Sequence, residues 1–567
     1  MILVFTNKED SHPTRVIRYL NNWSVPVFRL NTECLLTDYE FHWWCNAQGA
    51  DFHIKNIKNG LEMYGHEVTA IWDRRPLVPN ELFISHEEEE VNKYNLDEAH
   101  EFLSFLRYYL KDVFSIGSIV EDRPASSKML QLDVAQRLGM QIPDTCFANR
   151  KEPIANFAGR YGSLSLKAIG DSSVFLGGEE EYVFYSQKAK AMDVVAQPEE
   201  AFSQTACFVQ EYIEKAYELR LTVIGEDVVA CKIDSQAQTD ATGKVDWRQG
   251  YEHDLKHEIV EVPDNIKVFC RLFLKEMKLH FGCFDFIVTP NGDYVFLECN
   301  PNGQWLWIEL LTGYDISRMM TVNLVQYENL DLLLNLYAIN SQSTHEDEMR
   351  RFILEQLKTL NVEVLQDEMG NVFVTKGNND EYPCVAAHID EVHPPCKRNL
   401  KVVDGMVYAL DDEGNQVGIG ADDKNGIWVA LNLLQTEPVL KVAFFVHEEK
   451  FEDQAGCVGS VACDLSFFSN VKYVLECDRK GSSDLVYVGK DVPLCEPCFI
   501  PLEIQNRFGY APVAGGKTDV VELKLRGLEK PCCNISCGYY NAHKNNEFTI
   551  LSELHNCLAF VKTFIRL

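Results

Sequence analysis

The sequence lacks the features of an exported or membrane-bound protein. No apolar run approaches the roughly 18 residues of a membrane-spanning helix. The start, MILVFTNKED, has neither the basic region nor the long apolar core of a signal peptide. The 19 cysteines follow no framework spacing, so a disulfide scaffold is not indicated. We therefore expect a cytoplasmic protein with reduced thiols and no membrane partner.

Positive charge is also scarce. The 567 residues include 53 lysines and arginines against 85 aspartates and glutamates, a formal net charge of −32. This balance argues against a nucleic-acid partner, because polyanions attract basic surfaces. Local basic pockets for phosphate groups are still compatible with it. The 46% of hydrophobic residues and 24% of charged residues are those of an ordinary globular protein.

The residue pattern changes twice along the chain and predicts three domains. Residues 1–118 have the strand and helix pattern of a compact α/β domain, and residues 119–325 contain apolar strands separated by loops. Residues 326–567 alternate helices and strands, which is typical of a doubly wound α/β sheet. The fold class expected is therefore a multidomain protein of α/β and α+β type. The polar stretch 236–257 is predicted to be a long loop.

A β-hairpin is predicted over residues 281–305. Two runs rich in Phe, Val and Ile flank the segment TPNGD, and Asn-Gly is a strong turn signal. Asp285 lies in the first run, and Glu298 and Asn300 point to one face of the second. Buried acidic groups need a partner, and three such oxygen ligands suit Mg²⁺. The alternative is a pair of acidic residues on the solvent face of an amphipathic hairpin.

Residues 1–325 resemble the ATP-grasp superfamily. The spacing from Asp285 to Glu298, thirteen residues on, and to Asn300 is similar to that of the superfamily's ligands for two Mg²⁺ ions. The resemblance implies ATP as cofactor and assigns further contacts in chain order: Lys128 and Lys167 to the phosphates, Gln210, Glu211, Tyr212 and Ile213 to adenine, and Glu218 to the ribose. Lysines suit this role because the triphosphate is polyanionic.

Shorter motifs resemble the ATP-grasp ligases that make graspetides, the microviridin and grasp-with-spasm type. They are YELR at 217–220, KIDS at 232–235, DWR at 246–248 and ECNPNGQW at 298–305, with Asp10 and FRLN at 28–31 near the start. The resemblance implies that an Asp or Glu side chain of a precursor peptide is phosphorylated. A Ser, Thr or Lys side chain of the same peptide then displaces phosphate to form an ester or amide crosslink.

Two arginines are candidates for clamping the acyl phosphate in such a reaction. Arg220 and Arg248 carry guanidinium groups, which bind phosphate bidentately. For Arg248, the alternative is a solvent-facing loop residue.

The last 240 or so residues carry a second ordered set of acids and histidines, most of them at the ends of predicted strands. The segments are VAAHIDEV, GADDKNG, HEEK, LECDRK and YYNAHKNNEF, which contain His388, Asp390, Asp422, Glu448, Glu449, Asp478 and His543. Two histidines with several carboxylates suit two zinc ions, or other divalent metals, that share a bridging carboxylate.

This set resembles the co-catalytic zinc aminopeptidase and deacylase clan, which includes peptidase T. The resemblance implies that His388 and Glu449 are ligands, that Asp422 bridges both ions, and that Asp478 and His543 complete the two coordination spheres. Asp390 would orient His388, and Glu448 would be the general base.

Two departures from the clan's pattern concern chain length and one loop. The gaps of 34 positions from His388 to Asp422 and of 65 from Asp478 to His543 do not hold a full lid insertion. We therefore expect a minimal hydrolase domain without a full lid. Residues 515–519 resemble the clan's Gly-Thr-Asp loop on the substrate side, but Lys517 interrupts it.

The leading hypothesis is a bifunctional enzyme that crosslinks a precursor peptide and hydrolyses peptide or amide bonds. One alternative is a ligase of amino acids or small peptides with an editing or recycling hydrolase. Another is that one half is a non-catalytic peptide-binding module. The sequence leaves homo-oligomerisation open.

Overall fold

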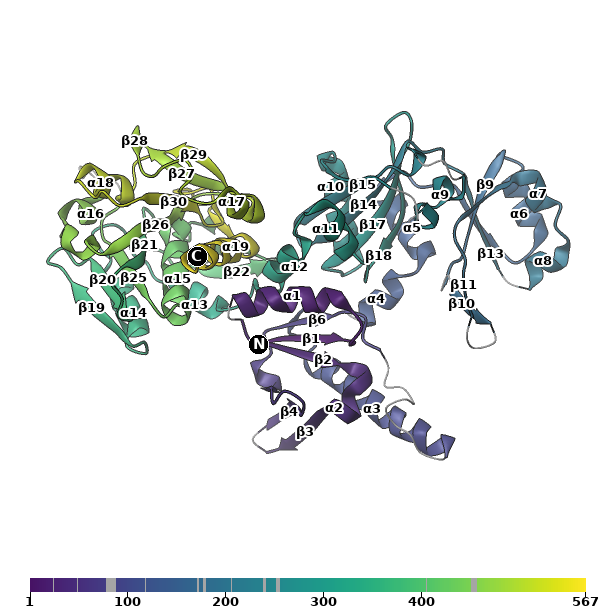
Figure 1. Cartoon of the computed structure of the whole chain (residues 1–567), viewed down its shortest axis with the longest axis horizontal. Helices are drawn as coiled ribbons and strands as arrows, with labels where there is room; N and C mark the ends of the chain where they lie inside the picture. The colour runs from purple at the N-terminus through teal and green to yellow at the C-terminus, as the bar shows by residue number, and fades with distance from the viewer. Residues whose placement is uncertain are drawn as a thin grey trace. The chain divides into compact units, whose positions relative to one another are not determined.

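The computed structural model of the chain describes residues 1–23, 25–47, 49–77, 88–117, 119–170, 173–176, 180–204, 206–237, 241–250, 255–403, 405–449 and 456–567 (Figure 1). The chain forms two compact units. Unit 1 comprises Met1–Tyr19 and Val27–Leu324, and unit 2 comprises Leu20–Pro26 and Val325–Leu567. Both units mix helices and sheets, so the predicted mixed α/β multidomain class is confirmed. None of the helices in the described residues is long and apolar enough to span a membrane.

Unit 1 begins with a parallel sheet in the order β2-β1-β6-β7. Its strands are β1 Ile2–Thr6, β2 Val27–Asn31, β6 Ala70–Asp73 and β7 Phe114–Ile116. All five residues of β1 are buried, as expected for an apolar strand inside a parallel sheet. Helix α3, Glu89–Tyr109, contributes Leu103 and Leu106 to the core that contains Leu3 and Phe5.

Smaller elements complete this part of unit 1. They are most of α1 Ser11–Asn22, α2 Leu35–Asp38, α4 Ile119–Ala125 and an antiparallel sheet of β3 Tyr39–Asn46, β4 Gly49–Asn56 and β5 Glu62–Tyr64.

Two antiparallel sheets form the remainder of unit 1. The first has the order β12-β9-β13-β8 and consists of β8 Thr145–Ala148, β9 Ser163–Lys167, β12 Gln187–Lys190 and β13 Cys207–Glu211. The second has the order β16-β15-β14-β17-β18 and consists of β14 Tyr217–Ile224, β15 Asp227–Ile233, β16 His257–Val260, β17 Phe281–Val288 and β18 Tyr294–Asn300. The pair β10 Ser173–Leu176 and β11 Glu180–Val183 forms a separate hairpin.

The core beside the second sheet follows from the helix period. In α10, Asp264–Glu276, the buried residues include Ile266, Phe269 and Phe273, spaced three and four apart on one face. This face packs in one cluster with Phe284 and Phe296 of the sheet and with residues of α5, Lys128–Arg137. The other helices of unit 1 are α6 Lys151–Ala158, α7 Ala191–Val195, α8 Glu199–Ser203, α11 Leu306–Thr312 and most of α12 Ile316–Val325.

The predicted hairpin is formed by β17 and β18, joined by a turn that contains Asn291-Gly292. The register shifts by one residue within it, so that Phe286 opposes Phe296 whereas Asp285 opposes Glu298. Leu297 is the extra residue of this β-bulge. In a regular hairpin without the bulge, Leu297 would oppose Asp285, and the Glu298 side chain would point to the other face of the sheet. The bulge therefore brings the two carboxylates together.

The prediction of a long loop over 236–257 is wrong in its middle. Residues Ala241–Val245 form α9 and Trp247–Gly250 form a 3₁₀ helix, while 238–240 and 251–254 lie outside the described residues. Asp246, between the two helical turns, is buried. Its carboxylate accepts hydrogen bonds from Ser186 N and from Arg248. The polar composition of residues 236–257 does not indicate these specific contacts.

Unit 2 is built on a mixed nine-stranded sheet in which β25, β21, β26 and β30 are parallel. In spatial order the strands are β19 Val362–Gln366, β20 Val372–Lys376, β25 Leu440–Phe445, β21 Tyr382–His388, β26 Val471–Arg479, β30 Cys532–Ser536, β27 Asp484–Gly489 and β28 Val492–Pro493, with β29 Ala511–Gly515 beside β27. The strands of the parallel centre are the ones that carry His388 and Asp478, or that immediately precede Glu448 and Glu449.

Helices cover both faces of this sheet. Every residue of β21 is buried, which requires cover on both sides. Helix α15, Ala421–Thr436, packs against β21 and β26 and against α13 Leu330–Ala338 and α19 Leu551–Ile565. Cys384 and Ala386 of β21 share a cluster with Val520 and Leu523 of α18, Asp519–Leu525. The remaining helices are α14 Asp347–Leu357, α16 Val458–Ala462 and α17 Leu502–Phe508.

A second small sheet fills the segment between His388 and Asp422. It contains β22 Asn399–Val403, β23 Met406–Leu410 and β24 Gln416–Val417, together with β31 Tyr539–Tyr540 and β32 Phe548–Ile550 from near the C-terminus. The strand pair β31 and β32 flanks His543, so this sheet joins the chain segment before Asp422 to the segment that carries His543.

Candidate active sites

One cavity of unit 1 brings together every residue predicted for the nucleotide half. It has a volume of about 920 Å³. Its lining includes Lys128, Lys167, Gln210, Glu211, Tyr212, Ile213, Glu218, Arg220, Arg248, Asp285, Glu298 and Asn300. These residues come from both antiparallel sheets, from α5 and from the 3₁₀ helix after α9.

The carboxylates of Asp285 and Glu298 face each other across the hairpin and are met by cations. Arg220 Nη1 donates to both carboxylate oxygens of Asp285, at 2.9 and 2.8 Å. Lys128 Nζ lies 3.4 Å from Glu298 Oε2. Burial raises the pKa of Asp285, and the charge of Glu298 adds to this, whereas Arg220 opposes it. Oxygen donors on two facing carboxylates fit Mg²⁺.

Glu298 differs from Asp285 because more cations surround it. Burial raises the pKa of Glu298, but Lys128, Lys167 and Arg248 outweigh burial and lower it. Burial in turn lowers the pKa of Lys167. The cavity therefore holds an ionised glutamate beside two lysines, an arrangement suited to a polyanionic ligand with its divalent counter-ions.

The opposite end of the cavity is formed by strand β13 and the residues after it. Gln210 donates to Thr145 Oγ1 at 2.9 Å, and Lys188 lies over the ring of Tyr212, 3.8 Å from its centroid. Glu218, at the start of β14, pairs with Lys215 at 2.8 Å. Burial raises the pKa of Glu218, against the effect of Lys215.

Arg248 lines the cavity but is held by its neighbour. Its Nε and Nη2 atoms donate to Asp246 at 2.8 and 2.6 Å. Neither Asp246 nor Lys215 was predicted as a site residue. The DWR motif contained the signal for Asp246, because an acid two residues before an arginine can bind it bidentately.

Gln131 of α5 is a further residue that sequence reasoning missed. The side chain is buried, with Nε2 donating to Ala125 O and Cys299 O, both at 2.6 Å, and Oε1 accepting from Cys299 N at 2.9 Å. It thereby holds the strand that carries Glu298 and Asn300. A glutamine on an amphipathic helix gives no sequence signal for such a contact.

Arg74 fastens the loop after β18 to the first sheet of unit 1. Its Nη1 donates to Asn302 O at 2.7 Å and to Gly303 O at 2.9 Å, while Nε donates to Asp10 at 3.0 Å. The Asp10 segment noted in the sequence thus bears on the position of the ECNPNGQW motif.

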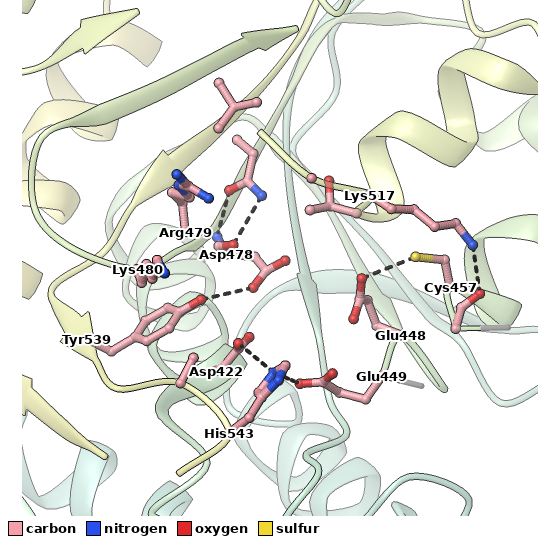
Figure 2. Close-up of a pocket in the computed structure, with 16 residues that line it drawn as sticks. Asp422, Glu448, Glu449, Cys457, Asp478, Arg479, Lys480, Lys517, Tyr539 and His543 are labelled. Atoms are coloured by element: carbon pink, nitrogen blue, oxygen red, sulfur yellow. Dashed lines mark hydrogen bonds and ion pairs between the residues drawn. The ribbon is translucent and has the colours of Figure 1, made fainter. Parts of the chain in front are cut away.

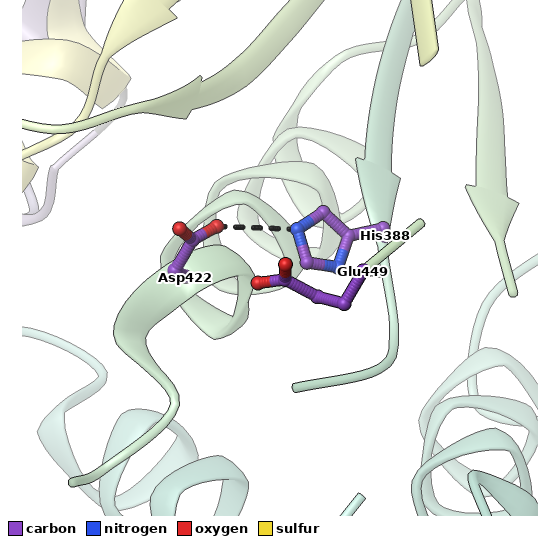
Figure 3. Close-up of side chains that lie close together, drawn as sticks. All are labelled: His388, Asp422 and Glu449. Carbon is purple, nitrogen blue, oxygen red and sulfur yellow. Dashed lines mark hydrogen bonds and ion pairs between the residues drawn. The ribbon is translucent and has the colours of Figure 1, made fainter. Parts of the chain in front are cut away.

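A second cavity, in unit 2, has a volume of about 320 Å³ and is lined by five of the predicted hydrolase residues: Asp422, Glu448, Glu449, Asp478 and His543 (Figure 2). His388 lies beside them, close to Asp422 and Glu449 (Figure 3). Asp390, two residues after His388, contacts the His388 ring. The structure therefore brings all seven predicted residues together.

Asp422 is placed between the two histidines. Its Oδ1 lies 3.2 Å from His388 Nε2, and its Oδ2 lies 3.2 Å from His543 Nε2. His543 Nε2 is also 2.8 Å from Glu449, and His388 Nε2 is 3.6 Å from Asp478. The groups thus form two sets that share Asp422, an arrangement that fits two metal ions bridged by one carboxylate.

Asp390 connects His388 to the two glutamates that follow β25. His388 Nδ1 lies 3.4 Å from Asp390 Oδ1 and 3.0 Å from the Asp390 carbonyl oxygen. The same carboxylate accepts from Glu448 N at 2.9 Å and Glu449 N at 3.0 Å. It therefore orients both His388 and the two glutamates.

The titration behaviour reflects crowding of buried charge. Burial lowers the pKa of His388, but its bonds to Asp390, Asp422 and Asp478 raise it well above the usual value. Bonds to Asp422 and Glu449 raise the pKa of His543 to about 11. Burial raises the pKa of Glu448 well above its usual value. A site with this excess of carboxylates fits divalent cations, which offset the cost of burying them.

Two residues near Glu448 and Asp422 were not predicted. Cys457 Sγ donates to Glu448 Oε1 at 3.1 Å. Asp423 caps the regular part of α15, which begins after a kink at Asp422 and Asp423, because its side chain accepts from Gly426 N at 2.9 Å. The GADDKNG motif contained the signal for this cap, an acid three residues before glycine at a helix start.

Glu547 is the third residue of unit 2 that was not predicted, and it braces the loop before Asp422. The fully buried side chain accepts from Gly420 N at 2.7 Å and from Ile419 N at 3.0 Å. His393 Nε2 lies 3.1 Å from the same oxygen. Four residues after His543, Glu547 links the segments that carry His543 and Asp422.

No protein-family model matches the sequence. The chain is 24% identical over 218 residues to a probable alpha-L-glutamate ligase of Vibrio atlanticus (strain LGP32), a match that covers 38% of this chain and 68% of that protein.

Solved structures show the fold. The aminopeptidase PepT of Bacillus cereus ATCC 10987 aligns with 42% of this chain and 98% of its own, at 16% identity and a TM-score of 0.35. The RiPP-associated ATP-grasp ligase of Chryseobacterium gregarium, in complex with ADP and a leader and core peptide, aligns with 57% of this chain and 96% of its own, at 24% identity and a TM-score of 0.51. More than half of this chain therefore has the ATP-grasp fold.

Proposed function

We propose that unit 1 is an ATP-dependent ligase of the graspetide type, which forms side-chain ester or amide crosslinks in a precursor peptide. The observation that carries this proposal is the convergence of twelve predicted residues on one cavity, with Asp285 opposite Glu298. The similar ligase of Chryseobacterium gregarium was solved with ADP and with a leader and core peptide, which supports both the nucleotide and the class of substrate.

The reaction joins two side chains at the expense of ATP. An oxygen of an Asp or Glu side chain attacks the γ-phosphorus, ADP leaves, and the hydroxyl or amine of a second side chain then attacks the acyl carbon. Phosphate leaves and the nucleophile's proton passes to solvent, so each crosslink removes one water from the peptide. Mg²⁺, when bound, screens the anionic triphosphate and carboxylate from one another.

The residues of the cavity have separate roles in this reaction. Asp285, Glu298 and Asn300 would hold the two Mg²⁺ ions, and Lys128 and Lys167 would bind phosphate oxygens. Gln210, Glu211, Tyr212 and Ile213 position adenine, and Glu218 the ribose. Arg220 and Arg248 hold the acyl phosphate, which requires that their ion pairs with Asp285 and Asp246 are shared with the ligand.

Mass spectrometry tests the proposal. A candidate precursor rich in Thr, Ser, Lys, Asp and Glu, incubated with ATP and Mg²⁺, is expected to lose one water per crosslink. Glu298→Gln should abolish the loss, whereas Glu258→Gln, an exposed position on β16 of the same sheet, should leave it intact. Crosslinking by the Glu298→Gln variant would show that the magnesium site is wrongly assigned.

Unit 2 is, in the same proposal, a metal-dependent hydrolase of peptide or amide bonds with two zinc ions or other divalent metals. The donor set around Asp422 supports it, with His388 and Asp478 on one side and His543 and Glu449 on the other. The metals, when bound, polarise the scissile carbonyl and lower the pKa of water. Asp390 orients His388, and Glu448 accepts the proton of the attacking water and passes it to the leaving amine.

Metal content tests this half. We expect two zinc ions per chain after loading, and about one or fewer in Asp422→Ala, because the bridging carboxylate serves both ions. Fewer than one zinc per wild-type chain would favour a non-catalytic binding module. The domains proposed are 1–118 and 119–325 for the ligase and 326–567 for the hydrolase, which lacks a full lid.

A second candidate function is favoured by the match to the probable alpha-L-glutamate ligase. In this alternative, unit 1 joins amino acids or small peptides, and unit 2 edits or recycles the product. ATP-dependent phosphate release with glutamate and other amino acids, in the absence of any precursor peptide, would support it. Release that requires the precursor would support the crosslinking ligase.

A further inference from the structure

Three basic side chains line the same cavity as the acids of unit 2. They are Arg479 and Lys480, next to Asp478, and Lys517, on the side of Glu448 and Cys457 (Figure 2). In a chain with 53 basic and 85 acidic residues, three cations around one small cavity stand out against the overall charge. The metal-binding residues do not use them.

These cations differ in how firmly they are held. Arg479 donates from Nε and Nη2 to Asp484 Oδ2 at 3.1 and 3.0 Å. Lys517 Nζ lies 3.1 Å from Glu522 and donates to Gly456 O at 3.1 Å. These contacts hold both side chains beside the cavity.

Lys480 has no such partner. It is exposed, directly after β26, and its ammonium group makes no hydrogen bond or ion pair with the residues that the structure describes. Its charge is therefore available to a ligand. Its position, two residues after Asp478, places that charge close to the metal-binding groups.

The rest of the lining does not suit an apolar side chain. Among the described residues around the cavity, the larger apolar groups are Val486 and the ring of Tyr539. Tyr539 directs its hydroxyl to Asp478 Oδ1 at 3.4 Å. Pockets that select large apolar side chains are lined mostly by apolar and aromatic groups. This cavity instead offers charge of both signs.

We infer that the hydrolase site of unit 2 selects anionic substrates, peptides or amides with an Asp or Glu residue next to the scissile bond, and that Lys480 is the main determinant. This inference rests on the proposed hydrolase function and names its substrate class. With the carboxylates engaged by metals, Lys480 provides an unshared positive charge for a substrate carboxylate, and Arg479 adds to the positive potential. An acid-rich peptide is also what the proposed ligase of unit 1 requires.

Matched peptides test the inference on the zinc-loaded full chain. Three series differ at the residues flanking the scissile bond, with Glu, Gln or Leu. We expect kcat/KM to be about tenfold higher for Glu than for Gln, the size of one charge-assisted contact near the surface. The Glu-to-Gln ratio should fall to about one in Lys480→Ala and below one in Lys480→Glu, and 0.5 M salt should reduce it in the wild type.

A lysine on the same strand provides the control. Lys472 of β26 is exposed and does not line the cavity, so Lys472→Ala should keep the wild-type ratio. Equal rates for Glu and Gln peptides in the wild type would overturn the inference, and so would a ratio unchanged in Lys480→Ala. Either result would leave the proposed hydrolase intact.

Binding separates this inference from the proposed function. If the zinc-loaded chain cleaves no peptide, the hydrolase proposal fails, and the Kd values of the Glu and Gln peptides decide the inference. A tenfold preference for the Glu peptide that Lys480→Ala removes would support an anion-selective site. Equal Kd values would overturn it.

Discussion

Replacing Glu547 tests how unit 2 holds the residues proposed to bind metal. In Glu547→Ala, three buried groups lose their acceptor: Ile419 N, Gly420 N and the His393 ring. Each unsatisfied buried donor costs about 1–3 kcal/mol. Because the loop can relax in part, we expect unit 2 to lose about 3–5 kcal/mol of unfolding free energy.

A graded series sharpens this expectation. Glu547→Gln can still place a carbonyl oxygen where Oε2 lies, but it exchanges charge-assisted hydrogen bonds for neutral ones. Its expected loss is about 1–2 kcal/mol. Zinc affinity should weaken about 10–100-fold in Glu547→Ala, the usual effect of removing a group that positions metal ligands.

Two measurements check the series. Urea unfolding gives the free energies, and competition with a chromophoric chelator gives the zinc affinities. Glu503→Ala, at an exposed position of α17, is the matched control and should change neither. A Glu547→Ala variant that unfolds within about 0.5 kcal/mol of the wild type and keeps its zinc affinity would refute the bracing role.

Three further changes have expected outcomes. Glu391→Gln should destabilise unit 2 by about 3–5 kcal/mol in urea unfolding. The reason is that buried Arg398 and Lys424, 2.6 and 3.1 Å from the Glu391 carboxylate, lose their counter-charge. A smaller loss of unfolding free energy than in Lys397→Ala would contradict this expectation. Burial lowers the pKa of His555 to about 3, so the unfolded chain binds one more proton than the folded chain between about pH 6.5 and 3. Stability from this group is therefore complete well above pH 6.5 and falls by about 1 kcal/mol from pH 6.5 to 5.5. The metal-free His555→Gln variant should not show this loss of unfolding free energy between pH 6.5 and 5.5. A stability profile against pH identical to that of the wild type would refute the expected direction. Arg220→Lys should lower precursor-dependent phosphate release about 100-fold, because one ammonium cannot replace the guanidinium that binds Asp285; near-normal release would exclude Arg220 from the reaction.

The sequence determined most of the secondary structure because its signals are local. The runs rich in Phe, Val and Ile in β17 and β18, the Asn-Gly turn and the three-and-four spacing in α10 each depend on neighbouring residues alone. The motifs of unit 2 could also be located, since most of them lie at a strand end where a parallel sheet opens its site.

The tertiary structure decided how these residues meet. The bulge at Leu297 turns Glu298 toward Asp285. The thirteen-residue spacing from Asp285 to Glu298 does not indicate which residue forms the bulge. The stretch around Asp246 was predicted as loop because composition does not reveal a buried carboxylate bound to Arg248. Glu547 acquires its role from Ile419 and Gly420, more than a hundred residues away in sequence. Such contacts depend on packing between distant segments, which no local pattern encodes. Packing likewise decides that Lys480 lines the cavity beside Asp478 without a polar side-chain partner among the described residues.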